Sequence, residues 1–308
     1  MAIRILTDQA PVQTPMVSRR SGIAGTLASA LLSNRKALAG AAVLVAFTLI
    51  AIFAPVISPY DPHALQFEPI LGPSRAHLLG TTGNGQDIFS QLMWSTRESL
   101  LLAVVAGIMA TVIAVVVGVS AAYLGGLWDH VLNLVTDVFL VIPTLPLMIV
   151  VAAYAASGGV AVLIAVIVIT GWSYGARQLR SQALSLRNRE FLEAARVRGE
   201  RSLYIIVFEV LPNMTSLIVA IFLGAALYAV LAAAGLQFIG LGDTNALSWG
   251  TMLYWAQANG ALLAGSPLWV LAPGICIALL GAAFALLNYA FDEIANPALR
   301  PVRRKRWS

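Results

Sequence analysis

The sequence predicts an all-α integral membrane protein with six transmembrane helices. Of its 308 residues, 59% are hydrophobic and only 11% are charged, and the mean hydropathy is +0.83. Soluble domains carry about 25% charged residues, so a soluble fold has no interior that would bury this apolar excess. The uncharged runs reach the length of about 20 residues that a helix needs to cross a bilayer.

Six segments have the length and composition of membrane spans. In chain order they are Ala37–Ile57, Ser99–Tyr123, Val131–Ala155, Val160–Ala176, Asn213–Gly235 and Leu268–Ala290. The third and fourth come from one apolar region that is divided at Ser157-Gly158-Gly159, where adjacent glycines permit a tight turn. Residues 246–264 contain Trp and Tyr side chains and are expected to lie at, or dip into, the outer membrane interface.

The basic residues predict that both termini are cytoplasmic. Cytoplasmic flanks of membrane helices carry an excess of Lys and Arg. With the N-terminus inside and six spans, all of the 19 Lys and Arg residues except Arg75 and Arg97 fall on the cytoplasmic side. A seventh span at 246–264 would move the basic C-terminal tail outside. Topology therefore explains the pI of about 9.7, and nucleic-acid binding is not expected because no aromatic–basic module is present.

This topology divides the chain into four parts. They are a cytoplasmic N-terminal tail (1–36), the first span with an extracytoplasmic loop (37–98), a membrane core (99–291) that includes a cytoplasmic loop at 177–212, and a basic cytoplasmic tail (292–308).

Several kinds of chemistry are excluded by missing motifs. A P-loop needs Gly-x4-Gly-Lys-Ser/Thr, and neither lysine of this chain, Lys36 or Lys305, follows a glycine. No ATPase of that class is therefore encoded, and the chain is expected to bind no cofactor. The three histidines lie outside the spans without metal-ligand spacing, and each is expected at the surface: His63, His77 and His130.

Asp137 is the only carboxylate inside a predicted span, about two turns from the cytoplasmic end of the third. Either neighbouring helices hold it near the interface, or it lies on a transport pathway or at a gate. Carriers driven by protons or sodium usually bury ionisable groups near the middle of the membrane. One off-centre acid is therefore a poor basis for an ion-driven cycle.

The cytoplasmic loop is predicted to begin with a short helix over residues 189–198. Arg189 and Glu193 are spaced i,i+4, and Glu193 and Arg196 are spaced i,i+3, so both pairs are suited to ion pairing on a helix. Gly199 supplies a left-handed C-terminal stop. A glutamate and two alanines inside the segment favour helix.

Phe191, Leu192 and Ala195 are predicted to form one apolar face of that helix. A groove on another protein is the expected place for this face, and the alternative is that it packs on the membrane-side surface of the chain itself. A second helix, Ser202 to Val210, leads to Pro212 where the chain re-enters the membrane.

The segment Arg189–Gly199 followed by Leu211-Pro212-Asn213 resembles the cytoplasmic "EAA" loop of permease subunits in bacterial ATP-driven (ABC) importers. Four further stretches are similar to motifs of the second (C-type) permease of the dipeptide/oligopeptide group, so that the resemblance covers roughly residues 75–300. They are His77–Leu92 ("HxLGTDxxGRDxxSRL"), Asp137 through Pro143 and Leu147 ("DxxxxxPxLxL"), Phe238–Gly242 with Ser248-Trp249-Gly250 ("FLGLG…SWG"), and Asn296–Arg300 ("DPRLR").

The resemblance implies a type I ABC importer permease that forms half of a translocation pathway in a bacterial or archaeal cytoplasmic membrane. It implies as partners a second, non-identical (B-type) permease, cytoplasmic ATPase subunits that bind ATP and Mg, and an extracytoplasmic substrate-binding protein. The resemblance implies that the ATPase is bound by Phe191, Leu192, Glu193, Ala194, Ala195, Arg196, Gly199, Leu211 and Pro212. Candidates for the pathway or a gate are Asp137, Pro143 and Gln237.

The sequence also departs from the pattern of that group. Thr82 and Gln86 stand where the group has Asp and Arg, which removes a charge pair from the outer loop, and Ala233, Asn296 and Glu209 also differ from common residues. Peptides are the expected substrate. Oligosaccharides, nickel or other metal chelates, and opines are alternatives within the group, and a membrane scaffold or receptor without transport is an alternative of another class.

Overall fold

The computed structural model describes residues 34–154 and 159–295, and these residues form helices joined by loops, without a β-strand. The elements are α2 (Arg35–Ile57), α3 (Ile88–Leu124), α4 (Gly126–Val141), α5 (Thr144–Tyr154), α6 (Gly159–Leu186), α7 (Glu190–Val197), α8 (Ser202–Tyr204), the π-helical turn η2 (Ile205–Val210), α9 (Leu211–Asn213), α10 (Thr215–Phe238), α11 (Trp249–Ala258) and α12 (Pro267–Ala295). The predicted all-α membrane fold is confirmed. Both terminal tails, residues 155–158 of the predicted turn, and Asn296 lie outside the described residues.

Among the described residues, five helices are long and apolar enough to cross a membrane: α2, α3, α6, α10 and α12. Helices α4 and α5 reach that length only when taken together, and their axes meet at 87°. The prediction of one continuous helix over Val131–Ala155 is therefore wrong. Ile142 has an extended backbone (φ −63°, ψ 129°) and Pro143 follows it. Proline offers no N–H to the helix and disfavours helical geometry in the residue before it.

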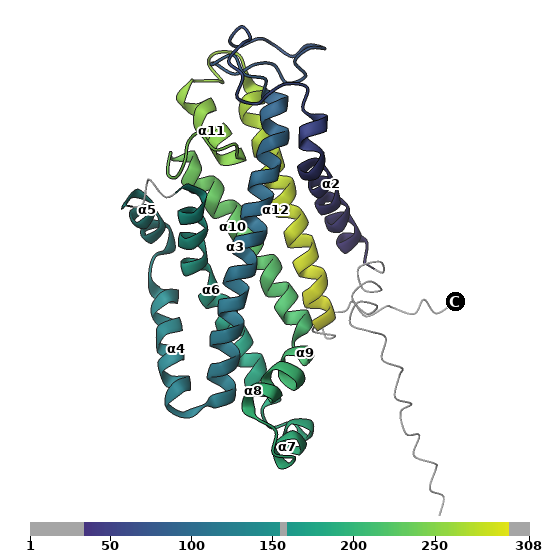
Figure 1. The fold of residues 1–308 in the computed structure, drawn as a ribbon, viewed down its shortest axis with the longest axis vertical. Coiled ribbons are helices and arrows are strands. Elements are labelled where there is room, and N and C mark those ends of the chain that lie inside the picture. Colours follow the sequence, from purple (N-terminus) through teal and green to yellow (C-terminus); the bar gives the residue numbers. More distant parts are fainter. Residues whose placement is uncertain (1–33, 155–158, 296–308) are drawn as a thin grey trace, which may run out of the picture.

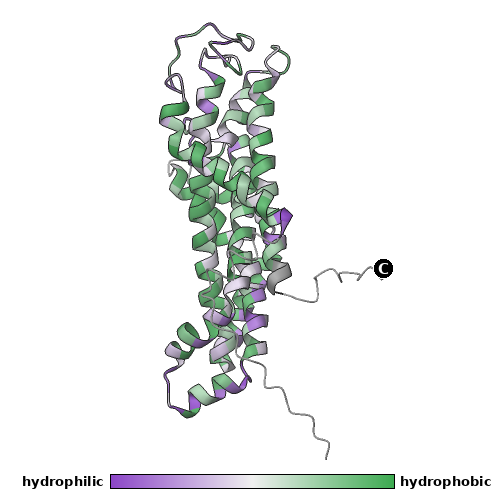
Figure 2. Ribbon diagram, turned by 90° about the vertical axis from the view of Figure 1, so that its right-hand side faces the viewer, coloured by the Kyte–Doolittle hydropathy of each residue, from purple (hydrophilic) through white to green (hydrophobic). Residues whose placement is uncertain are grey.

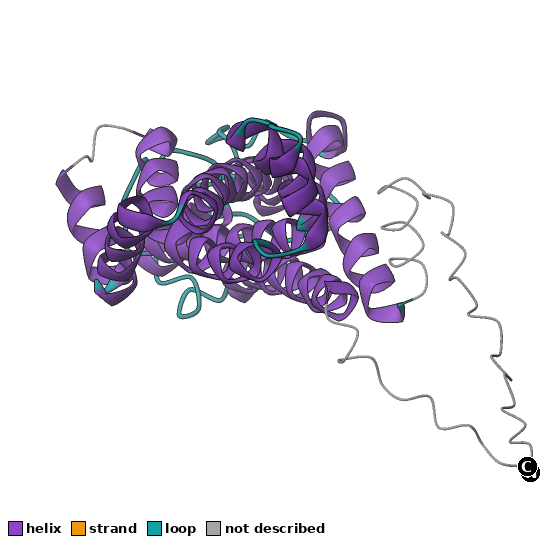
Figure 3. Ribbon diagram, turned by 90° about the horizontal axis from the view of Figure 1, so that it is seen from below, coloured by secondary structure: helices purple, strands orange, loops and turns teal. Residues whose placement is uncertain are grey.

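The spanning helices lie side by side, as the view from below in Figure 3 shows, and α3 lies in the middle in Figure 1. It packs against α2, α6 and α10, and α10 packs against α12. Small residues allow close approach, since a Cβ added to Gly118 of α3 would lie 2.3 Å from the carbonyl oxygen of Ala176 on α6. Figure 2 shows hydrophobic residues along the bundle and hydrophilic residues gathered towards its two ends.

The two ends of the bundle are built differently. Helices α7, α8 and α9 lie at one end (bottom of Figure 1), which is also the side from which α2 starts and at which α12 ends. The 58–87 loop and α11 lie at the opposite end. Helix α11 has ten residues and is too short to cross a bilayer. Its Trp249 is fully buried and packs edge-on against Phe47, with ring centroids 5.4 Å apart.

Candidate functional site

Helix α7 ends in a complete glycine cap, as predicted. Gly199 has φ +78°. Its N–H donates to the carbonyl of Arg196 at 2.9 Å, and the N–H of Glu200 donates to the carbonyl of Ala195 at 3.3 Å. These two bonds form the Schellman arrangement, which requires a left-handed residue at this position. The direction in which the chain leaves α7 is therefore fixed by one glycine.

Two residues of the apolar face of α7 are buried within this chain, and the third remains partly exposed. Leu192 and Ala195 are fully buried in a core cluster with Leu179 of α6 and Ile205 of η2. The expectation that both would pack in a groove on another protein is wrong, because α7 folds back onto its own bundle and fills this core. Phe191 keeps about a third of its surface exposed.

The exposed residues of α7 include two acids, one arginine and apolar groups. They are Glu190, Phe191, Glu193, Ala194, Arg196 and Val197. Val197 is 88% exposed. A face of this kind complements a partner surface that offers basic and apolar groups.

The predicted ion pairs of Glu193 are absent from the described part of the chain. Arg189 is the N-cap residue with an extended backbone, so it lies outside the helical i,i+4 row. Arg196 turns away from Glu193: it donates to the carbonyl of Arg187 at 3.2 Å and covers the ring of Tyr123 at 5.5 Å. Glu193 is left available on the exposed face.

The predicted second helix is present, but its central residues form a π-helical turn. Residues 202–213 are helical throughout, but Ile205–Val210 form a π-turn in which the N–H of Leu211 donates to the carbonyl of Ile206. Pro212 follows and has no N–H to donate, which favours such a local change of register. Leu211 packs against the same core cluster as Leu192, whereas Pro212 is exposed.

A cavity of about 430 Å³ opens between the bent pair α4–α5 and helices α6, α10 and α12. Its polar lining consists of Thr144, Thr170, Ser173, Tyr174, Gln178, Tyr228 and Asn288. The Tyr228 hydroxyl donates to Thr170 Oγ1 at 3.2 Å. The lining residues include hydroxyl and amide groups and no charged side chain. Sequence analysis missed this set because its members lie on four separate elements, with no spacing that connects them.

The three predicted pathway residues have different surroundings. Pro143 forms the bend between Leu140 and Thr144, which both line the cavity. Asp137 is paired with Arg177 of α6, which agrees with an acid held by a neighbouring helix. Gln237 is absent from the cavity lining: it is buried, and its Oε1 accepts from Ser248 Oγ at 2.8 Å. The structure thus gives Gln237 a contact between α10 and the start of α11.

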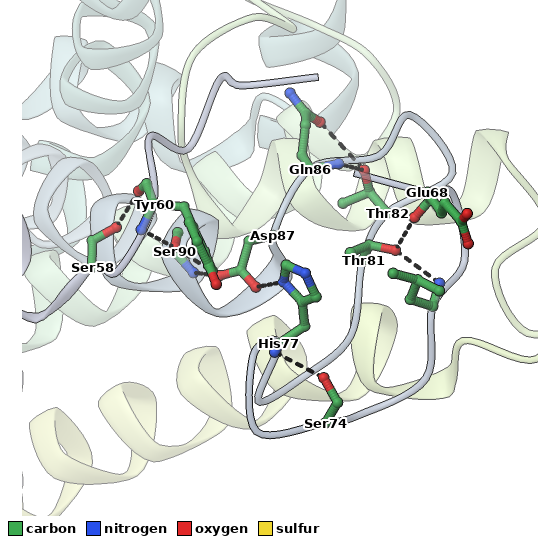
Figure 4. Close-up of polar contacts among 11 residues, drawn as sticks. Ser58, Tyr60, Glu68, Ser74, His77, Thr81, Thr82, Gln86, Asp87 and Ser90 are labelled. Carbon is green, nitrogen blue, oxygen red and sulfur yellow. Dashed lines mark hydrogen bonds and ion pairs between the residues drawn. The ribbon is translucent and has the colours of Figure 1, made fainter. Parts of the chain in front are cut away.

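The 58–87 loop contains a buried polar network that sequence analysis missed (Figure 4). Asp87 is fully buried and caps α3 by accepting from the N–H of Ser90 at 2.7 Å. Its other oxygen lies 2.9 Å from His77 Nδ1. The prediction that His77 is a surface residue is wrong, because the rings of Tyr60 and Phe67 cover it at centroid distances of 5.3 and 4.5 Å. An Asp directly before an apolar run is a signal for a helix N-cap.

Thr82 and Gln86 form a neutral contact in this loop. The Thr82 hydroxyl accepts from the N–H of Gln86 at 3.1 Å, and Gln86 Oε1 accepts from Gln91 Nε2 at 2.9 Å. The loop is therefore held here by hydrogen bonds between uncharged groups.

Two family models and several curated proteins match this chain. Residues 114–300 match the family model "Binding-protein-dependent transport system inner membrane component", and residues 28–73 match "N-terminal TM domain of oligopeptide transport permease C". The chain is 34% identical over 280 residues to the oligopeptide transport system permease protein OppC of Mycobacterium tuberculosis, covering 89% of this chain and 94% of that protein. It is 31% identical to the dipeptide transport system permease protein DppC of Alkalihalophilus pseudofirmus, covering 88% of each. It is 33% identical to the nickel transport system permease protein NikC of Escherichia coli, covering 87% of this chain and 96% of that protein.

Proposed function

The chain belongs to the family of inner membrane components of binding-protein-dependent transport systems, and from that premise we propose that it forms one half of the translocation pathway of a peptide importer. As a member of this family it is a multi-pass membrane subunit of an ABC importer and not an enzyme. Its substrate, its partner subunits and its orientation in the membrane are proposed from the geometry of the chain.

The observation that carries the proposal is the open polar cavity. Its hydroxyl and amide groups lie on helices that cross the membrane, and Tyr174 at its wall is 67% exposed in the single chain. Polar groups at membrane depth face other protein or a water-filled passage, because lipid offers them no hydrogen bonds. A second permease subunit would close the cavity into a passage.

The lining favours peptides over metal ions. Peptides present many amide donors and acceptors, which hydroxyl and amide side chains match. No His, Cys, Asp or Glu is among the lining residues, so the cavity as described lacks the ligands that transition metals prefer. Relatives named for oligopeptides and dipeptides support the same assignment. The relative named for nickel makes metal chelates the alternative.

The ends of the bundle support the proposed partners. The exposed acidic and apolar face of α7 would bind the ATPase subunits, which would supply the sites for ATP and Mg. Basic residues of α6 to α8 and the N-terminal end of α2 gather on that side, which is expected to be cytoplasmic, with both termini there. The extracytoplasmic binding protein would dock at the end formed by the 58–87 loop and α11.

Transport by the reconstituted complex tests this proposal. The chain is co-expressed with its candidate second permease and ATPases and placed in proteoliposomes with the binding protein. ATP-dependent uptake of labelled peptide is expected, with lower uptake for Tyr174→Ala. Wild-type uptake is expected for Leu279→Ala, which removes an exposed apolar side chain of α12 that is not part of the lining. Uptake of a nickel chelate without peptide uptake would contradict the substrate assignment. The purified chain alone is expected to hydrolyse no ATP.

A further inference from the structure

Two ion pairs join α4 to α6. Arg180 donates two hydrogen bonds to the carboxylate of Asp129, from Nε to Oδ1 at 2.6 Å and from Nη2 to Oδ2 at 2.8 Å. Arg177 pairs with Asp137. The two acids lie about two turns apart on α4, and the two arginines lie one turn apart on α6, so each pair of like residues shares one side of its helix. The Asp129–Arg180 pair is the more buried, with side chains 19% and 28% exposed.

Helix α4 has few other buried contacts. It adjoins α3 and packs on α6, and Thr136 is its one buried residue. Several of its large apolar side chains point outward, among them Leu127, Leu134 and Val141 with 78%, 64% and 83% of their surface exposed. Phe139 packs on the core through the ring of Trp172 of α6, at a centroid distance of 5.3 Å. The position of α4 on α6 therefore depends strongly on the ion pairs.

The same two helices connect α7 to the cavity. Helix α6 ends at Leu186 and α7 begins at Glu190, and the N–H of Arg189 donates to the carbonyl of Leu186 at 2.9 Å. Because the side chain of Arg196 also holds the carbonyl of Arg187, a displacement of α7 is passed to the end of α6. At the other end of the path, α4 contributes Phe139 and Leu140 to the cavity wall.

We propose that the two-bond contact between Asp129 and Arg180 is the rigid link through which movement of α7, passed to α6, reaches the α4 side of the cavity wall. A guanidinium that forms two parallel bonds to one carboxylate resists both sliding and rotation, unlike a single ion pair. Asp129 and Arg180 are thus positioning residues for transport. This inference rests on the proposed function, because it assumes that α7 moves when the ATPases bind nucleotide.

The test uses the full complex in proteoliposomes with Asp129→Asn, Arg180→Gln, and the exchanged pair Asp129→Arg with Arg180→Asp. His130→Gln is the matched control, since His130 is the exposed neighbour of Asp129 on the same helix. A fluorophore on Leu140→Cys, in a chain whose single native cysteine is replaced, reports nucleotide-dependent change at the α4 side of the cavity wall. Peptide uptake per ATP hydrolysed is measured in parallel.

We expect Asp129→Asn and Arg180→Gln to lower uptake per ATP by about fivefold or more and to reduce the fluorescence change, with ATP hydrolysis retained. The exchanged pair is expected to restore most of both signals. A cross-link formed by a bifunctional methanethiosulfonate reagent between Asp129→Cys and Arg180→Cys is expected to leave transport intact, because a rigid link does not open during the cycle. This cross-link keeps the test valid even where a single variant assembles poorly.

Wild-type uptake per ATP and wild-type fluorescence change in Asp129→Asn would overturn the proposal, and so would inhibition by the cross-link between positions 129 and 180 that reduction reverses. Failure of the proposed function has a different signature. In that case the wild-type complex transports no peptide, while its nucleotide-dependent fluorescence still reports whether the Asp129–Arg180 contact transmits movement.

Discussion

Substitution of Gly199 isolates the contribution of one backbone angle to the shape of the α7 face. Gly199 has φ +78°, and a Cβ built at this position meets no atom within 4 Å. The cost of adding a side chain therefore comes from the left-handed backbone, about 1–2 kcal/mol for an L-residue. It is smaller for asparagine, which adopts this conformation more readily, and largest for β-branched valine. Since 1.4 kcal/mol corresponds to a factor of ten, the ratio of correctly capped to uncapped α7 is expected to fall by about five- to thirtyfold.

The expected order of peptide uptake and of substrate-stimulated ATP hydrolysis is wild type, Gly199→Asn, Gly199→Ala and Gly199→Val, measured in the reconstituted complex. The bundle itself is expected to stay folded, because Leu192 and Ala195 remain anchored in the core. Equal activity of Gly199→Val and wild type would refute the reasoning. So would an asparagine variant as impaired as the valine variant, since that result would mean that a partner excludes any side chain regardless of backbone preference.

Three further predictions concern the α7 face, the outer loop and the orientation. Glu193→Lys places a positive charge on the exposed face of α7 and is expected to weaken ATPase binding by about 2–5 kcal/mol. The expected readout is loss of co-purifying ATPase, and unchanged co-purification would show that Glu193 is not part of the interface. Asp87→Ala removes the cap of α3 and the partner of a buried histidine, and is expected to lower the stability by about 1–3 kcal/mol in thermal unfolding, while Asp61→Ala in the exposed part of the loop serves as control. With the native cysteine replaced, a cysteine at Asn84 is expected to react with an impermeant maleimide from outside the cell and one at Val197 only after permeabilisation, and the reverse pattern would invert the topology.

The membrane class and five of the six spans were predictable because hydropathy is a sum over about 20 residues. The break in the third span at Ile142 was not predictable, since a sum over about 20 residues is insensitive to the conformation of a single residue. Pro143 was visible in the sequence, but a proline in an apolar run is also compatible with a kinked continuous helix. Its extended neighbour decides between a kink and the observed 87° bend.

Contacts between distant segments account for the other differences. The apolar face of α7 was predictable from its spacing, but periodicity states only that a face is buried and not which protein buries it, so Leu192 and Ala195 were misassigned. His77 lies in a polar stretch, and its burial depends on Tyr60 and Phe67, which come from earlier turns of the same loop. By contrast, the positive φ of Gly199 was predictable, because a helix cap depends on local sequence.

The 58–87 loop has one further consequence for assembly. It forms neither helix nor strand, yet backbone bonds such as Thr82 N–H to the Gln86 carbonyl at 2.8 Å and Thr81 N–H to the Leu71 carbonyl at 3.1 Å fix its course. Ordering a mobile backbone costs about 1–2 kcal/mol per residue. In a flexible loop this cost would arise when a partner docks, and it would weaken binding. Here the conformational entropy is already lost when the chain folds. A protein that binds this end would therefore meet a preformed surface, and its association rate would be set by diffusion and orientation rather than by the time a loop needs to become ordered.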